Sequence, residues 1–134
     1  MDKRVVITGL GAITPIGKNV EETWNSIKEK KCGIDEITLF NTENFKTKLA
    51  AEVKEYNPLE HFEAKQAKRL DRYSQFAMIA AREAVKSSEI SKENTDFNRV
   101  GIFVSSGIGG LTTIQEQCLS LIHISEPTRP LYIS

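Results

Sequence analysis

Two glycine-rich turns are the features of this sequence whose spacing could bind a nucleotide or an apolar ligand. Gly9-Leu10-Gly11 follows one apolar, β-branched run, and Gly107-Ile108-Gly109-Gly110 follows another. The dinucleotide fingerprint requires a further glycine three residues after the second, where this chain has Thr14 and Thr112. Pro15 also prevents a helix from starting directly after the first turn and presenting its N-terminus to a pyrophosphate. We therefore expect the first turn to pack tightly against neighbouring chain, with a small nucleotide-binding domain as the alternative.

The second turn offers a different chemistry, because its glycines could direct backbone amides into a cavity. It lacks the Lys-Ser or Lys-Thr pair of a phosphate-binding loop. Ile108 is the one sizeable side chain among these glycines. Two interpretations stay open: a turn whose glycines adopt positive φ, or a loop that lines the site of an apolar ligand.

The side chains that could act as nucleophiles or metal ligands are few and widely separated. Cys32 lies at the end of a helical pattern rather than at its start, and Cys118 lies late in another. A helix start would lower the pKa of a thiol, so we expect both cysteines to be inert. His61 is expected at the surface near a short helix, and His123 is assigned no role. We therefore predict no catalytic residue, no metal site and no cofactor.

Asp71 and Arg72 are adjacent charged residues on the strongest helical pattern. Such a pair could be taken for a catalytic acid and its partner. A structural ion pair or two solvated charges is the interpretation that we favour, because most exposed charges in proteins serve no chemistry.

The overall composition is that of a soluble globular protein of one domain. The chain has 134 residues, of which 40% are hydrophobic and 27% charged, and its formal net charge is zero. A balanced charge gives no reason to expect nucleic acid or an acidic membrane as a partner. No stretch of about 18 apolar residues is present, so no transmembrane helix is expected. Two cysteines in unlike contexts do not form a disulfide framework, and we expect a cytoplasmic protein.

Periodicity predicts strands and helices in alternation, which is typical of an α/β fold. One strand is expected at the N-terminal apolar run, one in the middle of the chain and one before the second glycine turn. The predicted strands are 4–8, 49–53 and 99–104. The first predicted helix begins at residue 19 or 21, and the later ones cover 57–65, 69–87 and 111–117.

The apolar faces of two helices are predicted to be buried. Val20, Trp24 and Ile27 lie at helical spacing on the first helix. The helix at 69–87 is apolar on most sides, which indicates that it is buried, and its alanines would let another backbone approach closely.

Several segments together resemble the N-terminal part of the β-ketoacyl–acyl-carrier-protein synthases of the thiolase-like superfamily, and most of all the elongating synthase II type. They appear in the order and spacing of that family and cover about residues 3–118. The segments are 4–17 (RVVITGLGAITPIG), Trp24, 31–34 (KCGI), 70–76 (LDRYSQF) and 106–111 (SGIGGL).

The resemblance implies a layered αβα fold, of which this chain would hold only the first half, and a homodimer in the complete enzyme. It implies decarboxylative condensation of an acyl-enzyme with malonyl–acyl-carrier protein, so acyl-carrier protein and a fatty-acyl chain are the expected partners. By the motif match, Ile108 would line the acyl pocket and limit the length of the chain, while Gly107 and Gly109 would shape the loop that bears it.

The family's nucleophilic cysteine and its two histidines lie in motifs that this chain does not contain, so we expect the chain itself to be inactive. Residues 119–129 instead resemble a translated sequencing-library adapter. We accordingly predict family sequence over residues 1–118 and an artefactual or disordered tail over 119–134. The alternative is a non-catalytic chain-length partner of a true synthase. We also predict marginal stability, because half of a fold leaves sheet edges and helix faces without partners.

Overall fold

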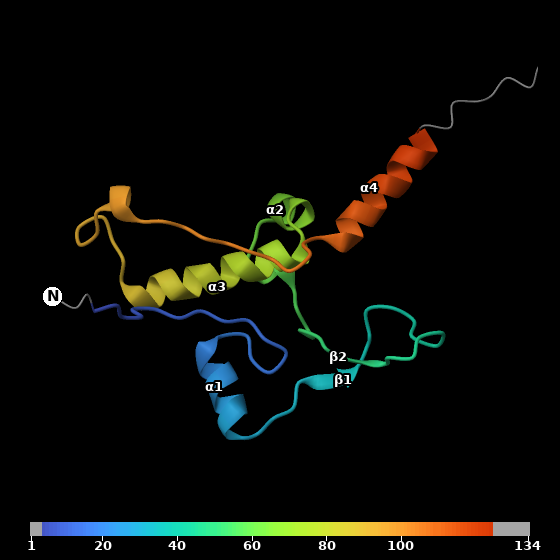
Figure 1. Cartoon of the computed structure of the whole chain (residues 1–134), viewed down its shortest axis with the longest axis horizontal. Coiled ribbons are helices and arrows are strands. Elements are labelled where there is room, and N and C mark those ends of the chain that lie inside the picture. The colour runs from blue at the N-terminus through green and yellow to red at the C-terminus, as the bar shows by residue number, and fades with distance from the viewer. Residues whose placement is uncertain (1–3, 125–134) are drawn as a thin grey trace, which may run out of the picture.

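The computed structural model describes the backbone of residues 4–124 and the side chains of residues 4–120 (Figure 1). The long helix α3 lies at the centre, and extended segments from both ends of the chain run along it. In chain order the elements are α1 (Val20–Lys28), β1 (Ile34–Glu36), β2 (Leu49–Ala51), a 3₁₀ helix (Pro58–Glu60), α2 (Ala64–Arg69), α3 (Arg72–Ser88), a second 3₁₀ helix (Phe97–Arg99) and α4 (Leu111–Ile124).

The helix α1 begins where its sequence predicts. Asn19 is the N-cap, and its Oδ1 accepts a hydrogen bond of 2.8 Å from the backbone N–H of Glu22. Acidic residues occupy the first turn and Lys28 the last, which matches the charges favoured at the two ends of a helix.

The predicted buried face of α1 is wrong. Trp24 is 59% exposed and Ile27 52%, whereas Ser26 is buried and donates a hydrogen bond of 2.6 Å to the carbonyl oxygen of Ile16. The side of α1 that packs is the side that meets the loop before it. Trp24 instead lines an open groove of about 420 Å³ between the N-terminal segment and α3.

The helix α3 agrees with its predicted range but not with its predicted burial. It starts at Arg72, after a break at Leu70 and Asp71, and ends at Ser88, followed by Glu89 as the C-cap, whose φ of 54° is left-handed. Gln75 and Ile79 are its buried residues. Its other apolar side chains are partly or largely exposed, so the prediction of a helix covered on most sides is wrong for the part of the chain described here.

The first glycine turn packs tightly, as predicted, and the backbone that it packs against is that of α3. A Cβ atom on Gly11 would overlap the carbonyl oxygen of Ala80 and would lie 2.9 Å from the nitrogen of Ala84. A Cβ atom on Gly9 would meet the carbonyl oxygen of Ala84 in the same way. Neither glycine has a positive φ, so glycine is needed here for close approach rather than for backbone conformation. Packing against α3 therefore accounts for both glycines without a nucleotide.

Glu83 fastens the N-terminal segment to α3. One oxygen of its carboxylate accepts a hydrogen bond of 2.9 Å from the N–H of Ala12, and the other accepts one of 2.9 Å from the N–H of Val20. Val20 is the first residue of α1, so the charge of Glu83 also lies at the positive end of that helix. A single side chain thereby connects α3 to segments more than 60 residues earlier in the chain.

Two of the predicted strands, 4–8 and 99–104, do not form. Both segments run extended or in a short 3₁₀ turn, and neither joins a sheet within residues 4–124. Val5 is 91% exposed and Phe103 97%. A β-strand depends on hydrogen bonds to a neighbouring strand, which an apolar, β-branched sequence cannot provide by itself.

The sheet that does form in the described chain has two antiparallel strands. Ile34 of β1 pairs with Ala51 of β2, and Glu36 pairs with Leu49. The prediction of a strand at 49–53 is therefore confirmed for 49–51, whereas β1 lies outside the predicted strands. Lys54 and Asp35 form an exposed ion pair of 2.5 Å beside this hairpin.

The chain buries little of its surface. Its accessible area is 12362 Å², whereas a compact folded monomer of 15.0 kDa would expose about 7,000 Å². Among the side chains of residues 4–120, Phe62 and Ile79 are the apolar ones that are buried. The structure is thus a partial α/β fold. Its exposed sheet edges and helix faces agree with the reason that we gave for marginal stability. The stability itself stays a prediction.

Candidate functional site

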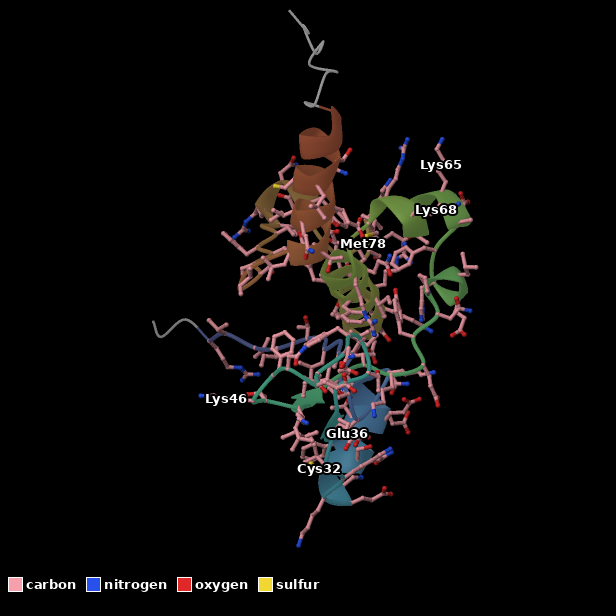
Figure 2. All side chains as sticks on the ribbon, turned by 90° about the vertical axis from the view of Figure 1, so that its right-hand side faces the viewer. Cys32, Glu36, Lys46, Lys65, Lys68 and Met78 are labelled. Atoms are coloured by element: carbon pink, nitrogen blue, oxygen red, sulfur yellow. The ribbon has the colours of Figure 1, made fainter. Side chains whose placement is uncertain are left out.

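An apolar groove lies along α3 next to the second glycine turn. Its volume is about 340 Å³, and residues 104–106 form its other wall. Met78, labelled in Figure 2, is among the α3 side chains that line it. The lining from α3 consists of Tyr73, Ser74, Ala77, Met78 and Ala81. The groove therefore leads along small and apolar side chains to the start of the Gly107–Gly110 loop.

The two halves of that loop differ in how they are held. Gly109 has a φ of 86°, its N–H donates a hydrogen bond of 2.9 Å to Ser106 Oγ, and a Cβ atom on it would lie 3.8 Å from Tyr73 Oη. Gly110 lies against the carboxylate of Asp71, which a Cβ atom would overlap. Around Gly107 no atom lies within 4 Å of such a position. The interpretation as a positive-φ turn is confirmed at Gly109, where an L-residue would be strained.

Ile108 projects from the unsupported half of the loop. Its side chain is 73% exposed in this chain and is not among the residues that line the groove along α3. Its expected role in an acyl pocket, together with those of Gly107 and Gly109, stays a prediction. The structure places all of them directly beyond the end of the groove, after Ser106.

Asp71 and Arg72 do not form the ion pair that their adjacency suggested. The carboxylate of Asp71 accepts a hydrogen bond from Thr113 Oγ1 on α4. Arg72 turns the other way, donating to the carbonyl oxygen of Val53 and lying 5.3 Å from the ring centre of Phe76. Each residue therefore joins α3 to a different part of the chain.

Gln75 is a connecting residue that sequence reasoning missed. Its Nε2 donates hydrogen bonds of 2.9 Å to the carbonyl oxygen of Ala67 and 2.8 Å to that of Leu70, and its Oε1 accepts one of 2.6 Å from Tyr56 Oη. Burial raises the pKa of the Tyr56 phenol, and the positive charge of Arg72 partly opposes this. A polar residue inside an apolar helical stripe was the available signal for Gln75, because such a residue must find partners when it is buried.

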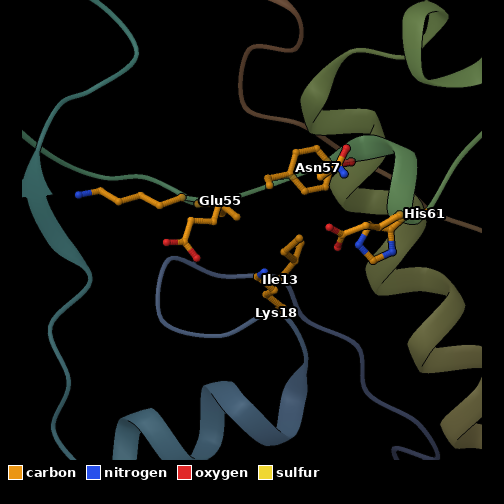
Figure 3. A pocket seen from close by; sticks show the side chains of 9 residues that line it. Ile13, Lys18, Glu55, Asn57 and His61 are labelled. Atoms are coloured by element: carbon orange, nitrogen blue, oxygen red, sulfur yellow. The ribbon is translucent and has the colours of Figure 1, made fainter. Parts of the chain in front are cut away.

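The residues considered as nucleophiles lie apart from the groove. Cys32 and Cys118 are both exposed. His61 is exposed, as predicted, and its ring stacks on Tyr56 with the ring centres 6.2 Å apart. His61, Ile13 and Lys18 are among the residues that line a small cavity (Figure 3). The cavity has a volume of about 10 Å³, which is space for roughly one water molecule. The side chain of His123 lies outside the described residues.

Within residues 4–124, no three His, Cys, Asp or Glu side chains gather closely enough to hold a metal ion. Among the helices of the same residues, none combines the length and apolar character that crossing a bilayer requires.

A family model described as "Beta-ketoacyl synthase, N-terminal domain" matches residues 2–128 of this chain. A 3-oxoacyl-[acyl-carrier-protein] synthase 2 from Staphylococcus aureus (strain N315) is 44% identical over 114 residues, which are 85% of this chain and 28% of that protein. The chain therefore spans less than a third of the length of such curated relatives.

Solved structures of the same kind resemble this fold. The ishigamide ketosynthase/chain length factor superposes with a TM-score of 0.69 at 30% identity, covering 87% of this chain and 30% of that one. A type II polyketide synthase acyl-carrier protein in complex with its hexaketide-bound ketosynthase gives a TM-score of 0.69 at 28% identity, covering 91% and 32%. The partial α/β fold is thus that of the first part of a ketosynthase chain, as the sequence motifs predicted.

Proposed function

This chain belongs to the β-ketoacyl synthase family, and we propose that it is the N-terminal part of a condensing enzyme that elongates fatty acids. In the proposed reaction, the acyl chain is held as a thioester on a cysteine. Malonyl–acyl-carrier protein loses carbon dioxide, and the resulting carbanion attacks the thioester carbonyl and expels the thiolate. The product is the chain lengthened by one two-carbon unit. The observation that carries the proposal is the family match over residues 2–128.

The apolar groove supports a role of this segment in holding the acyl chain rather than in bond formation. Its small and apolar side chains suit a hydrocarbon, and it ends where the loop with Ile108 begins. We propose that Ile108 lines the acyl pocket of the complete enzyme, with Gly107 and Gly109 shaping the loop. Acyl-carrier protein is the proposed partner, in keeping with the solved ketosynthase complex whose fold this chain shares. A homodimeric, cytoplasmic parent enzyme is part of the same proposal.

The isolated chain and a chimaera together test this function. The chimaera carries residues 4–118 of this chain in place of the matched segment of the S. aureus synthase 2. We expect the chimaera to form β-ketoacyl product from acyl- and malonyl-carrier protein, followed by mass spectrometry. The 134-residue chain alone is expected to form none, because no residue of it matches the family's cysteine or histidines. Turnover by the chain alone, or a folded but inactive chimaera, would contradict the proposal.

Substitution of Ile108 tests the acyl pocket. In the chimaera, Ile108→Phe is expected to lower kcat/KM for the longest acyl substrates by about tenfold or more, because the larger ring shortens an apolar cavity. Short acyl substrates should retain their rate. Ile34→Phe on β1, also at an exposed isoleucine, serves as the matched control. Equal losses for short and long substrates would argue that Ile108 affects folding rather than chain length.

A non-catalytic chain-length partner is the second candidate, since a ketosynthase/chain length factor shares this fold. The two candidates differ at the position of the nucleophilic cysteine, which this chain does not contain. The source gene, read across codon 119, decides between them and also tests the boundary that we propose near residue 118. α4 runs through that boundary to Ile124 as one helix.

A further inference from the structure

The Gly107–Gly110 loop is fixed at its second half by the first turn of α3. Gly109 faces Tyr73, and Gly110 faces Asp71. The first half, with Gly107 and Ile108, makes no comparable contact within the described residues. The position of Ile108 therefore depends on how firmly the residues after it are held.

Asp71 occupies an unusual place for a residue that precedes a helix. It is the N-cap of α3, yet its side chain accepts no hydrogen bond from that helix. Its half-buried carboxylate instead accepts one from Thr113 Oγ1, in the first turn of α4. An N-cap side chain commonly satisfies the free N–H groups of its own helix. Here the same kind of group joins the starts of two helices, through residues that are 42 positions apart.

We propose that Asp71 is a positioning residue for Ile108, acting through Thr113 and Gly110. The bond to Thr113 holds the start of α4, and the absence of a side chain at Gly110 lets the carboxylate lie against the loop. Two hydrogen bonds then restrict Ile108. The Ser106–Gly109 bond closes the short segment that contains it, and the Asp71–Thr113 bond holds the chain that follows. The inference rests on the proposed function in one respect, which is that the position of Ile108 sets the length of the acyl chain.

Amide hydrogen exchange of the 134-residue chain tests the anchor without any need for activity. Thr113→Val removes the donor and keeps the shape of the side chain, and it is expected to speed exchange of the Gly109 and Ile114 amides about tenfold. Both amides make hydrogen bonds next to the anchor. Thr113→Ser keeps the hydroxyl and should restore slow exchange.

Neighbouring residues supply matched controls for the anchor. Thr112→Val makes the same chemical change one residue earlier. Thr112 is exposed, and its hydroxyl has no hydrogen-bond partner among the described residues. It should leave the Gly109 amide unchanged. Gly110→Ala should act like Thr113→Val, because its methyl group would displace the Asp71 carboxylate. Equal effects of the two valine substitutions, or failure of Thr113→Ser to restore protection, would overturn the anchor.

Product chain length in the chimaera tests the consequence for specificity. Thr113→Val and Asp71→Ala are expected to change the ratio of kcat/KM for long and short acyl substrates by about three- to tenfold, as loss of one hydrogen bond allows. Asp71→Asn, which retains an acceptor oxygen, should show the smaller change. If the unsubstituted chimaera does not condense at all, the proposed function fails, while the exchange result still decides the anchor. An active chimaera whose ratio is unaffected by Thr113→Val would overturn the positioning role alone.

Discussion

Gly11→Ala is expected to release the N-terminal segment from α3. A methyl group at this position would overlap the carbonyl oxygen of Ala80 and lie 2.7 Å from its carbonyl carbon, and helix backbone cannot move aside as a side chain can. The cost should lie at the upper end of overpacking effects, about 3 kcal/mol or more. Amide exchange of the 134-residue chain provides the measurement: the Ala12 and Val20 amides, which are bonded to Glu83, should lose their protection.

Gly107→Ala is the matched control for that substitution. No atom lies within 4 Å of the added methyl group, and Gly107 is not among the residues with positive φ. We expect the control to keep the protection at Ala12 and to stabilise the chain by about 0.4–1 kcal/mol, because alanine restricts the unfolded chain more than glycine does. Similar protection in Gly11→Ala and Gly107→Ala would show that the close approach of the first turn to α3 does not occur in solution.

Gln75→Leu is expected to separate α2 from α3. Gln75 is 5% exposed, and its amide satisfies the carbonyl oxygens of Ala67 and Leu70 as well as the hydroxyl of Tyr56. Leucine has a similar size but leaves these polar groups without their partner. The expected loss in the free energy of unfolding is about 3 kcal/mol, measured by urea unfolding of the chain with circular dichroism.

Two further variants separate the polar network from the change in apolar character. Gln66→Leu makes the same substitution at an exposed position of α2 and should alter stability by no more than about 0.5 kcal/mol. Adding Tyr56→Phe to Gln75→Leu should recover part of the loss, because it removes the hydroxyl that the leucine leaves without a partner. Additive effects of the two substitutions would show that the Tyr56–Gln75 bond contributes nothing to stability.

The starts of α1 and α4, most of α3 and the family of this chain could be predicted from the sequence, whereas the helix predicted at 57–65 is a 3₁₀ helix at Pro58–Glu60 followed by α2. Asn19 as the start of α1 and the extent of α3 follow from capping groups and from apolar spacing, since the hydrogen bonds of a helix join residues that are close in the chain. The tight packing of the first glycine turn was likewise predictable, because Thr14 and Pro15 depart from a nucleotide-binding pattern, but its partner α3 was not predicted. The motifs from residue 4 to residue 111 identified a ketosynthase chain, and the comparisons confirm it.

Tertiary structure alone decided which segments pair and which side chains meet. The strands expected at 4–8 and 99–104 remain extended and exposed, because a strand needs a neighbour from elsewhere in the chain, whereas the unexpected β1 found one in β2. Glu83 and Asp71 act on groups that are 71 and 42 residues away, and local spacing carries no trace of such contacts. Local hydrogen bonding is encoded within a few residues of sequence. Contacts between distant segments depend on the whole path of the chain, which is why they became visible only in three dimensions.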